Sequence, residues 1–161
     1  MIQYPNLIPE CNVDTAFVEM LGYVGPNHAS DIFQVCAILD KKGPRQKAIG
    51  FIDGDKRKPP YLSNFKVVER IKGAQLLKHA DKDQYLVVVS PAMDRFIFDL
   101  CNELEINVSH YGLPKEFKGF LTFTKKVSIR KDVEFKNLLN TIRQKNPPTV
   151  SKIQSWIVKY S

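Results

Sequence analysis

Residues 47–58 have the sequence KAIGFIDGDKRK, and this stretch indicates both a fold class and a site. The apolar part, residues 47–53, predicts a buried strand that ends on Asp53. Residues 83–91, DQYLVVVSP, form a second apolar run of the kind found in parallel sheets that are covered on both faces. These two runs therefore predict the centre of a sheet.

Predicted helices alternate with the strands on either side of these runs. Apolar residues recur at helical spacing in several segments, whereas shorter apolar runs separate them. The alternation predicts an α/β fold with a mostly parallel central sheet flanked by helices, with a ligand site at the carboxyl ends of the strands. The further expected elements are strands at 6–10 and 74–79 and helices at 12–22, 31–43 and 92–106.

The helix boundaries are predicted from capping residues. Asn12 or Asp14 is expected to be the N-cap of the first helix, and Gly22 is expected to end it. Ser90 is expected to cap the helix after the second apolar run, with Pro91 as its first helical residue.

The charge distribution divides the chain at Pro114. Residues 1–113 contain 13 Lys and Arg against 14 Asp and Glu, whereas residues 114–161 contain 11 against 3, so the two parts carry −1 and +8. We expect residues 1–113 to form the α/β domain and residues 114–161 to form a basic, mostly helical extension packed on it. Such asymmetry predicts a polyanionic partner, although a solvated basic face is the alternative.

The composition is that of a globular domain, with 43% hydrophobic and 25% charged residues. The sequence contains neither a leader pattern nor an apolar run long enough to span a membrane, which predicts a cytoplasmic protein without a membrane partner. The three cysteines, Cys11, Cys36 and Cys101, are widely spaced and odd in number, which favours neither a disulfide framework nor a zinc site.

Three carboxylates follow two of the predicted strands. Asp53 and Asp55 end one strand, and Glu10 ends the strand at 6–10 immediately before a helix. Because loops after parallel strands converge at one edge, we expect these carboxylates to meet and to bind Mg²⁺, which prefers oxygen ligands. In the alternative interpretation, Asp53 and Gly54 form only a turn, and Glu10 is only a charge at a helix N-terminus.

The segments PECNVDTAFVEMLG (9–22) and IGFIDGDKRK (49–58) together resemble the TOPRIM family, which includes topoisomerases, bacterial primases and the nucleases of the overcoming-lysogenization-defect class. The resemblance covers about residues 6–105 and implies metal-dependent phosphodiester chemistry. It makes Glu10 a catalytic or metal-binding residue and Asp53 and Asp55 ligands of Mg²⁺ or Mn²⁺. It also implies that Asp94 is a further acidic ligand, whereas in the alternative interpretation Asp94 only favours the N-terminus of its helix. Cys11 stands where the family commonly has glycine.

The resemblance implies a small, stand-alone nuclease-like member that hydrolyses nucleic acid, with DNA as the expected substrate and an ATPase or another protein as a further partner. In this interpretation Glu10 binds the metal or activates water, and Lys56 stabilises the developing phosphate charge. The alternatives are a non-catalytic module that binds nucleic acid or a protein, and a phosphatase of the haloacid-dehalogenase type. The expected nucleic-acid contacts are Lys56, Arg57, Lys58, Lys125, Lys126, Lys131 and Lys136.

Overall fold

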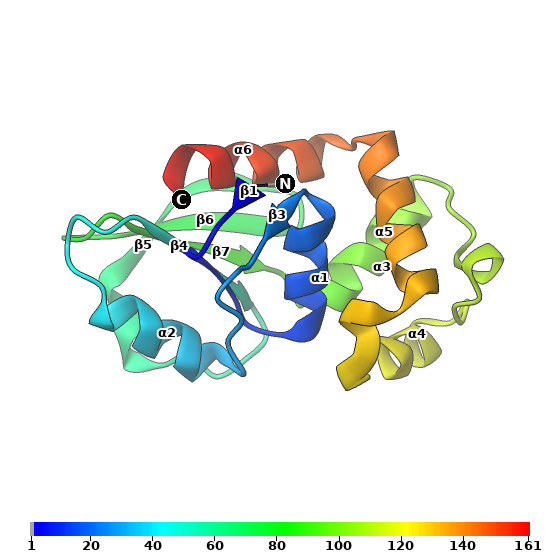
Figure 1. Cartoon of the computed structure of the whole chain (residues 1–161), viewed down its shortest axis with the longest axis horizontal. Helices are drawn as coiled ribbons and strands as arrows, with labels where there is room; N and C mark the ends of the chain where they lie inside the picture. The colour runs from blue at the N-terminus through cyan, green and yellow to red at the C-terminus, as the bar shows by residue number, and fades with distance from the viewer. Residues whose placement is uncertain (1) are drawn as a thin grey trace.

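The computed structural model describes residues 2–161 and contains a central five-stranded sheet in the order β2-β4-β7-β6-β5 (Figure 1). Three strands run parallel, namely β2 (Leu7–Pro9), β4 (Ala48–Asp53) and β7 (Gln84–Val89). The antiparallel strands β6 (Ala74–His79) and β5 (Phe65–Ile71) complete one edge, which makes the sheet mixed there. A separate parallel pair consists of β1 (Ile2–Gln3) and β3 (Tyr23–Val24).

Within residues 2–161, six α-helices flank the central sheet, so the predicted α/β class with a helical C-terminal part is confirmed. The helices are α1 (Asn12–Met20), α2 (Ile32–Lys41), α3 (Met93–Glu103), α4 (Phe117–Thr124), α5 (Val133–Lys145) and α6 (Pro148–Tyr160). Short 3-10 helices span η1 (Pro60–Asn64), η2 (Val108–Tyr111) and η3 (Val127–Lys131). Among residues 2–161, no helix has the length and apolar character that crossing a membrane requires.

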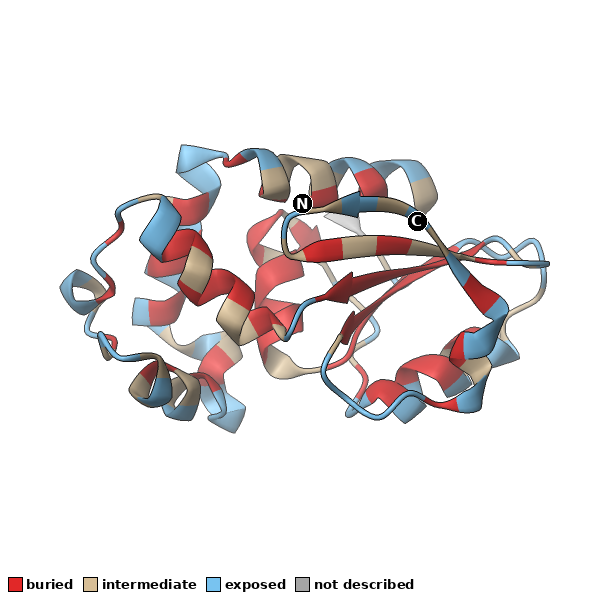
Figure 2. Cartoon of the chain, turned by 180° about the vertical axis from the view of Figure 1, so that it is seen from behind, coloured by how far each residue is buried: buried red, intermediate tan, exposed pale blue. Residues whose placement is uncertain are grey.

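The two faces of the sheet are covered by different helices because successive side chains of a strand point to opposite sides. On one face, Ile8 and Ile52 belong to the hydrophobic cluster that includes α2. On the other face, Leu7 and Phe51 belong to a larger cluster formed with α1, α3, α5 and α6. Every residue of β4 and β7 is buried, which explains their continuous apolar character (Figure 2).

Residues 114–161 share this larger cluster with the sheet. Trp156 and Ile153 of α6 are buried in it, and the Trp156 indole N–H donates to Glu69 Oε2 of β5 at 2.7 Å. Phe135 and Leu138 of α5 are buried in the same cluster. The basic C-terminal segment is therefore part of the core that positions the site.

The predicted helix boundaries need two corrections. Helix α1 is capped by Cys11, rather than by Asn12 or Asp14, because the Cys11 thiol accepts the Asp14 N–H while Asp14 accepts the Cys11 N–H. Helix α3 begins at Met93 rather than at Pro91, and its N-cap is Ala92, not Ser90.

Strand β5 was not among the predicted elements, although its burial alternates along the strand. Its alternating pattern and the Lys72-Gly73 turn, in which Gly73 has φ of +79°, are the signals that identify a hairpin with β6.

Gly50 lets helix α2 approach the sheet closely. A Cβ at this position would lie 2.8 Å from both Leu86 Cδ2 and Val35 Cγ1. Gly50→Ala should therefore lower the free energy of unfolding by about 1–3 kcal/mol through overpacking, as measured by chemical denaturation. Gly43→Ala is the matched control, because its nearest neighbour would be 3.9 Å away. Equal stability of the two variants would contradict this account of the packing.

Candidate metal centre and cleft

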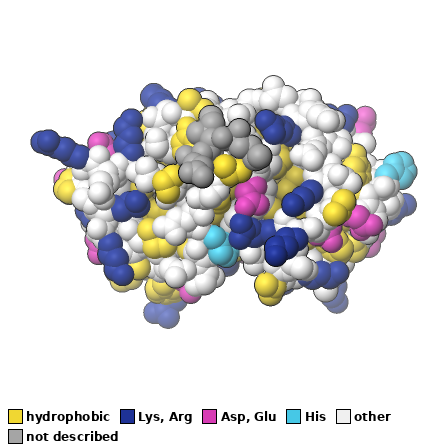
Figure 3. All heavy atoms as spheres, in the orientation of Figure 1, with side chains coloured by type: hydrophobic (Ala, Val, Ile, Leu, Met, Phe, Trp, Pro, Cys, Tyr) yellow, Lys and Arg dark blue, Asp and Glu magenta, His cyan; other side chains and the backbone are white. Residues whose placement is uncertain are grey.

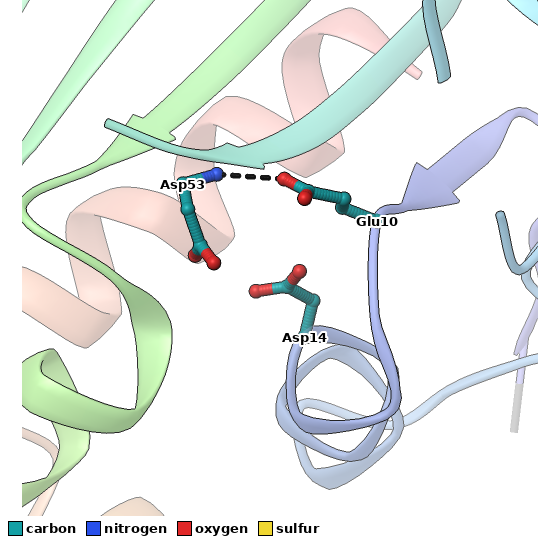
Figure 4. Close-up of side chains that lie close together, drawn as sticks. All are labelled: Glu10, Asp14 and Asp53. Atoms are coloured by element: carbon teal, nitrogen blue, oxygen red, sulfur yellow. Dashed lines mark hydrogen bonds between the residues drawn. The ribbon is translucent and has the colours of Figure 1, made fainter. Parts of the chain in front are cut away.

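Strands β2 and β4 bring Glu10 and Asp53 together at their carboxyl ends. Pro9 is paired with Phe51 in the parallel register, and the Glu10 N–H continues the ladder by donating to Phe51 O at 3.1 Å. The Glu10 side chain then turns back, and its Oε2 accepts the Asp53 N–H at 2.9 Å (Figure 4). Both residues are buried, with Glu10 fully inaccessible and Asp53 only 6% exposed. The predicted meeting of these two carboxylates is thus present.

Asp14 is a third carboxylate at this point, and it was not predicted as a site residue. It lies in the first turn of α1 and is fully buried. Its Oδ2 accepts the Cys11 N–H at 3.1 Å, whereas its Oδ1 is buried without a hydrogen-bond partner. The Asp14 carboxylate points toward Asp53 and Glu10 (Figure 4), and one oxygen from each of the three residues lies within 4.8 Å of the others.

The loop after β4 is held against the start of α3. The Gly54 N–H donates to Val89 O at 2.8 Å, and the Asp55 N–H donates to Pro91 O at 3.0 Å. The Asp53 Oδ1 accepts the N–H of Met93, the first residue of α3, at 3.0 Å. Asp53 therefore accepts the Met93 N–H, for which the N-cap residue Ala92 provides no side-chain acceptor. The dipole of α3 also favours a negative charge at this position.

Lys56 provides the cation nearest to these carboxylates. Its Nζ lies 2.5 Å from Glu10 Oε1 and 3.3 Å from Asp53 Oδ2, while 43% of its side chain remains exposed. Although partial burial lowers the pKa of Lys56, the hydrogen bond to Glu10 and the charges of Glu10 and Asp53 raise it overall. Lys56 thus stays charged and bridges the buried carboxylates to the surface.

Burial changes the proton affinity of the aspartates. Desolvation by burial, followed by the charge of Glu10, raises the pKa of Asp53 to about 6 in the absence of a metal. Burial, followed by the charge of Asp53, also raises the pKa of Asp14 well above its usual range. Three carboxylates facing a single lysine leave a deficit of positive charge at this point.

A cleft of about 710 Å³ opens beside Asp53 between the sheet edge and helix α4. Asp55 and Asp94 line this cleft but lie outside the close group of Glu10, Asp14 and Asp53. Burial raises the pKa of Asp94, and the nearby charge of Asp55 adds to this effect. These two carboxylates therefore face the space that a ligand would fill.

Of the predicted nucleic-acid contacts, the cleft is lined by Lys56, Lys125 and Lys126. The other four, namely Arg57, Lys58, Lys131 and Lys136, are exposed but are not among its lining residues. Lys136 instead borders a separate hollow beside Arg130, whose guanidinium forms an ion pair with Glu19 at 2.7 Å. Lys and Arg side chains are scattered over the face shown in Figure 3 rather than gathered in one patch.

The three buried carboxylates fit a hard divalent cation such as Mg²⁺ or Mn²⁺. Such ions take carboxylate oxygens as ligands and offset the repulsion between them. The unpartnered Asp14 Oδ1 is the strongest sign of this fit, since buried polar atoms are nearly always hydrogen-bonded. The same donor set suits Mg²⁺ and Mn²⁺ equally well.

The sequence prediction missed two residues for physical reasons, namely Asp14 of the buried carboxylate group and Arg95 of the cleft lining. Asp14 was considered only as a helix cap, although a carboxylate in the first turn of a helix that starts directly after Glu10 is well placed to reach the same sheet edge. Arg95 also lines the cleft, but its pairing with Asp99 at 3.0 Å and its position over the Phe117 ring depend on how α3 and α4 pack. Only the spacing from Glu10 to Asp14 was a signal in the sequence.

No protein-family model, curated protein or solved structure matches this chain. The resemblance to the TOPRIM family therefore stays a prediction that rests on the two quoted motifs.

The raised pKa of Asp53 predicts how stability depends on pH in the metal-free protein. The folded state binds the Asp53 carboxyl proton more tightly than the unfolded state does. The stabilisation that the protonated Asp53 gives to the fold is therefore fully present below about pH 4 and is lost as pH rises through about 6. Asp53→Asn keeps an oxygen for the Met93 N–H and removes the charge. It should raise the free energy of unfolding on the order of 2 kcal/mol at pH 8 and change it little at pH 4.

The measurement is urea denaturation at both pH values in EDTA. Asp81→Asn, an exposed aspartate outside the site, is the control and should have little effect at either pH. A loss of stability in Asp53→Asn at pH 8 would show that the charged carboxylate supports the fold instead of straining it.

Proposed function

We propose that this protein is a nuclease that hydrolyses phosphodiester bonds of nucleic acid with the help of a divalent metal ion. The single observation that carries the proposal is the buried, unpartnered Asp14 Oδ1, which belongs to a carboxylate group close to Glu10 and to Asp53, and Asp53 in turn lines the cleft. A cluster of buried carboxylates with too few cations is costly unless the carboxylates take up protons, as the raised pKa values of Asp14 and Asp53 indicate for the metal-free protein, or bind a further cation. The TOPRIM-like order of the motifs, with Glu10 after the first strand and Asp53-x-Asp55 after a later one, supports the same reaction class.

The side chains have separate roles in this proposal. Glu10, Asp14 and Asp53 hold the cation, which would polarise a phosphoryl oxygen and lower the pKa of a water molecule. Lys56 is long enough and exposed enough to leave Glu10 and pair with a phosphate in the cleft. Asp94, whose pKa is raised by burial, is placed to take or give a proton at the cleft wall.

The lysines at the end of α4 support a polyanionic substrate. Lys125 and Lys126 line the cleft together with Asp53, so a phosphodiester in the cleft would lie near these two cations as well as near the bound metal. Electrostatic stabilisation of this kind is usually the main catalytic contribution in phosphoryl transfer.

The position of Lys56 favours a second candidate, a non-catalytic module that binds nucleic acid. The Lys56 ammonium contacts both Glu10 and Asp53 and partly neutralises them without a metal. If Lys56 alone offsets the repulsion between the carboxylates, they have only a structural role, and the basic residues alone bind nucleic acid. The two candidates differ in whether Mg²⁺ or Mn²⁺ binds at all.

Asp14→Asn separates these candidates. The amide keeps an oxygen for the Cys11 N–H and lets its NH₂ group donate to the neighbouring carboxylates, so we expect the variant to fold and to be at least as thermostable as the wild type. Mn²⁺ affinity, measured by calorimetry, should fall about 10- to 100-fold, and Mg²⁺-dependent nicking of supercoiled plasmid should fall with it.

Asp132→Asn, which alters a helix-capping aspartate on α5, is the matched control and should retain both properties. Failure of the wild type to bind Mn²⁺, or to cleave either supercoiled plasmid or single-stranded DNA relative to an EDTA control, would reject the nuclease and leave the binding module.

Charge reversal tests the nucleic-acid contacts. The double variant Lys125→Glu/Lys126→Glu should weaken DNA binding and flatten the dependence of log affinity on log salt, by about 0.9 for each duplex phosphate that the protein no longer neutralises. The variant Lys131→Glu/Lys136→Glu changes the net charge equally but outside the cleft, and it should have a smaller effect on both quantities. Equal effects of the two double variants would indicate a long-range contribution of net charge rather than binding in the cleft.

A further inference from the structure

The cleft has a second wall whose chemistry differs from that of the carboxylates. Helix α4 contributes Phe117 and Leu121, which are half-buried and line the cleft. The Phe117 ring packs on Phe98 with ring centroids 5.4 Å apart, and the Arg95 guanidinium lies 4.6 Å from the Phe117 centroid. This wall therefore presents an apolar surface and a planar cation, and the ion pair with Asp99 at 3.0 Å and the Phe117 ring hold that cation in place.

The cleft lining contains further apolar residues outside α4. Pro91, Ala92 and Val13 line the cleft together with Asp53. The same space is therefore lined by carboxylates, lysines and apolar groups. A ligand that matches all three has a phosphate and a flat, weakly polar ring system, and these are the two parts of a nucleotide.

We propose that this cleft binds an unpaired nucleotide, with its base against Phe117 and Leu121 and its phosphate between Lys125 and the carboxylates. The proposal rests on the nuclease function above and specifies its substrate as a single strand or an unpaired end. Bases stack on aromatic side chains and on Arg guanidinium planes in proteins that bind single strands.

An intact duplex matches the cleft less well. Within a duplex the base faces are covered by neighbouring bases, so only phosphates and groove edges can contact a protein surface. Such a ligand would pair with Lys125 and Lys126 but would not cover the part of Phe117 and Leu121 that lines the cleft. The apolar wall therefore selects unpaired bases, and it comes from α4, which lies outside the residues that resemble the TOPRIM family.

Equilibrium binding without metal tests this proposal independently of catalysis. Fluorescence anisotropy in EDTA would compare a thymidine single strand of about 12 nucleotides, an abasic strand of equal length and a blunt duplex. The variants are Phe117→Ala and Leu121→Ala, and the control is Phe33→Ala, an exposed phenylalanine on α2 outside the cleft. Thermal melts verify that each variant is folded, and Leu121→Ala serves alone if Phe117→Ala unfolds.

The wild type should bind the thymidine strand more tightly than the abasic strand and the duplex. Each cleft variant should weaken thymidine-strand binding about 5-fold or more and leave abasic-strand binding unchanged, while Phe33→Ala changes neither. Equal binding of the thymidine and abasic strands, or unchanged binding by folded cleft variants, would overturn the proposal.

These results remain separable from the nuclease proposal. If the base-dependent binding is found but Mn²⁺ does not bind, the nucleotide site stands and the nuclease function fails. If Mn²⁺-dependent cleavage is found but the cleft variants bind normally, the nuclease stands and the base-binding wall is wrong.

Discussion

The mutual repulsion of three buried carboxylates is the constraint on which the arrangement of the site depends. Glu10, Asp14 and Asp53 are held together by backbone geometry, since each of them accepts a main-chain N–H through one of its carboxylate oxygens. Glu10 thereby ties β2 to β4, Asp14 closes the first turn of α1, and Asp53 ties β4 to α3. The fold thus concentrates negative charge where three of its connections meet, and the lone ammonium of Lys56 offsets only part of it.

The order of strands and helices made two of the three buried carboxylates predictable, namely Glu10 and Asp53. Buried parallel strands leave a strong apolar signal, and their carboxyl ends meet by topology, so the sequence alone predicted that Glu10 and Asp53 would meet. Asp14 was harder to find because a carboxylate near a helix start is explained equally well by capping. Only the structure shows that Asp14 Oδ2 accepts the Cys11 N–H and that Asp14 Oδ1 is left without a hydrogen-bond partner.

Other features depend on packing that no local pattern encodes. Lys56 directly follows Asp55 in a stretch of three basic residues, and the sequence predicted a charge-stabilising role for it but not its ion pairs with Glu10 and Asp53. The turn geometry after Gly54, which is held by Val89 O and Pro91 O, selects Lys56 as the one that contacts Glu10. Packing also decides which lysines of residues 114–161 reach the cleft. Because α4 packs beside α3, Lys125 and Lys126 line the cleft, whereas Lys136 on α5 borders a different hollow.

The C-terminal segment therefore combines two tasks. Its helices α5 and α6 complete the hydrophobic core, and α4 closes the cleft with an apolar wall and two lysines. This coupling explains why the charge excess is not spread along a separate binding arm. It also places the residues expected to choose the substrate on α4, whereas those expected to bind the metal lie at the ends of β2 and β4 and in the first turn of α1.

The most direct measurement is anomalous diffraction from crystals soaked in Mn²⁺. The account predicts one anomalous peak bounded by carboxylate oxygens of Glu10, Asp14 and Asp53, with the Lys56 ammonium displaced from Glu10. A Mn²⁺-soaked crystal without a peak at this position, in which Lys56 still bridges Glu10 and Asp53, would contradict the central claim that these buried carboxylates form a metal site.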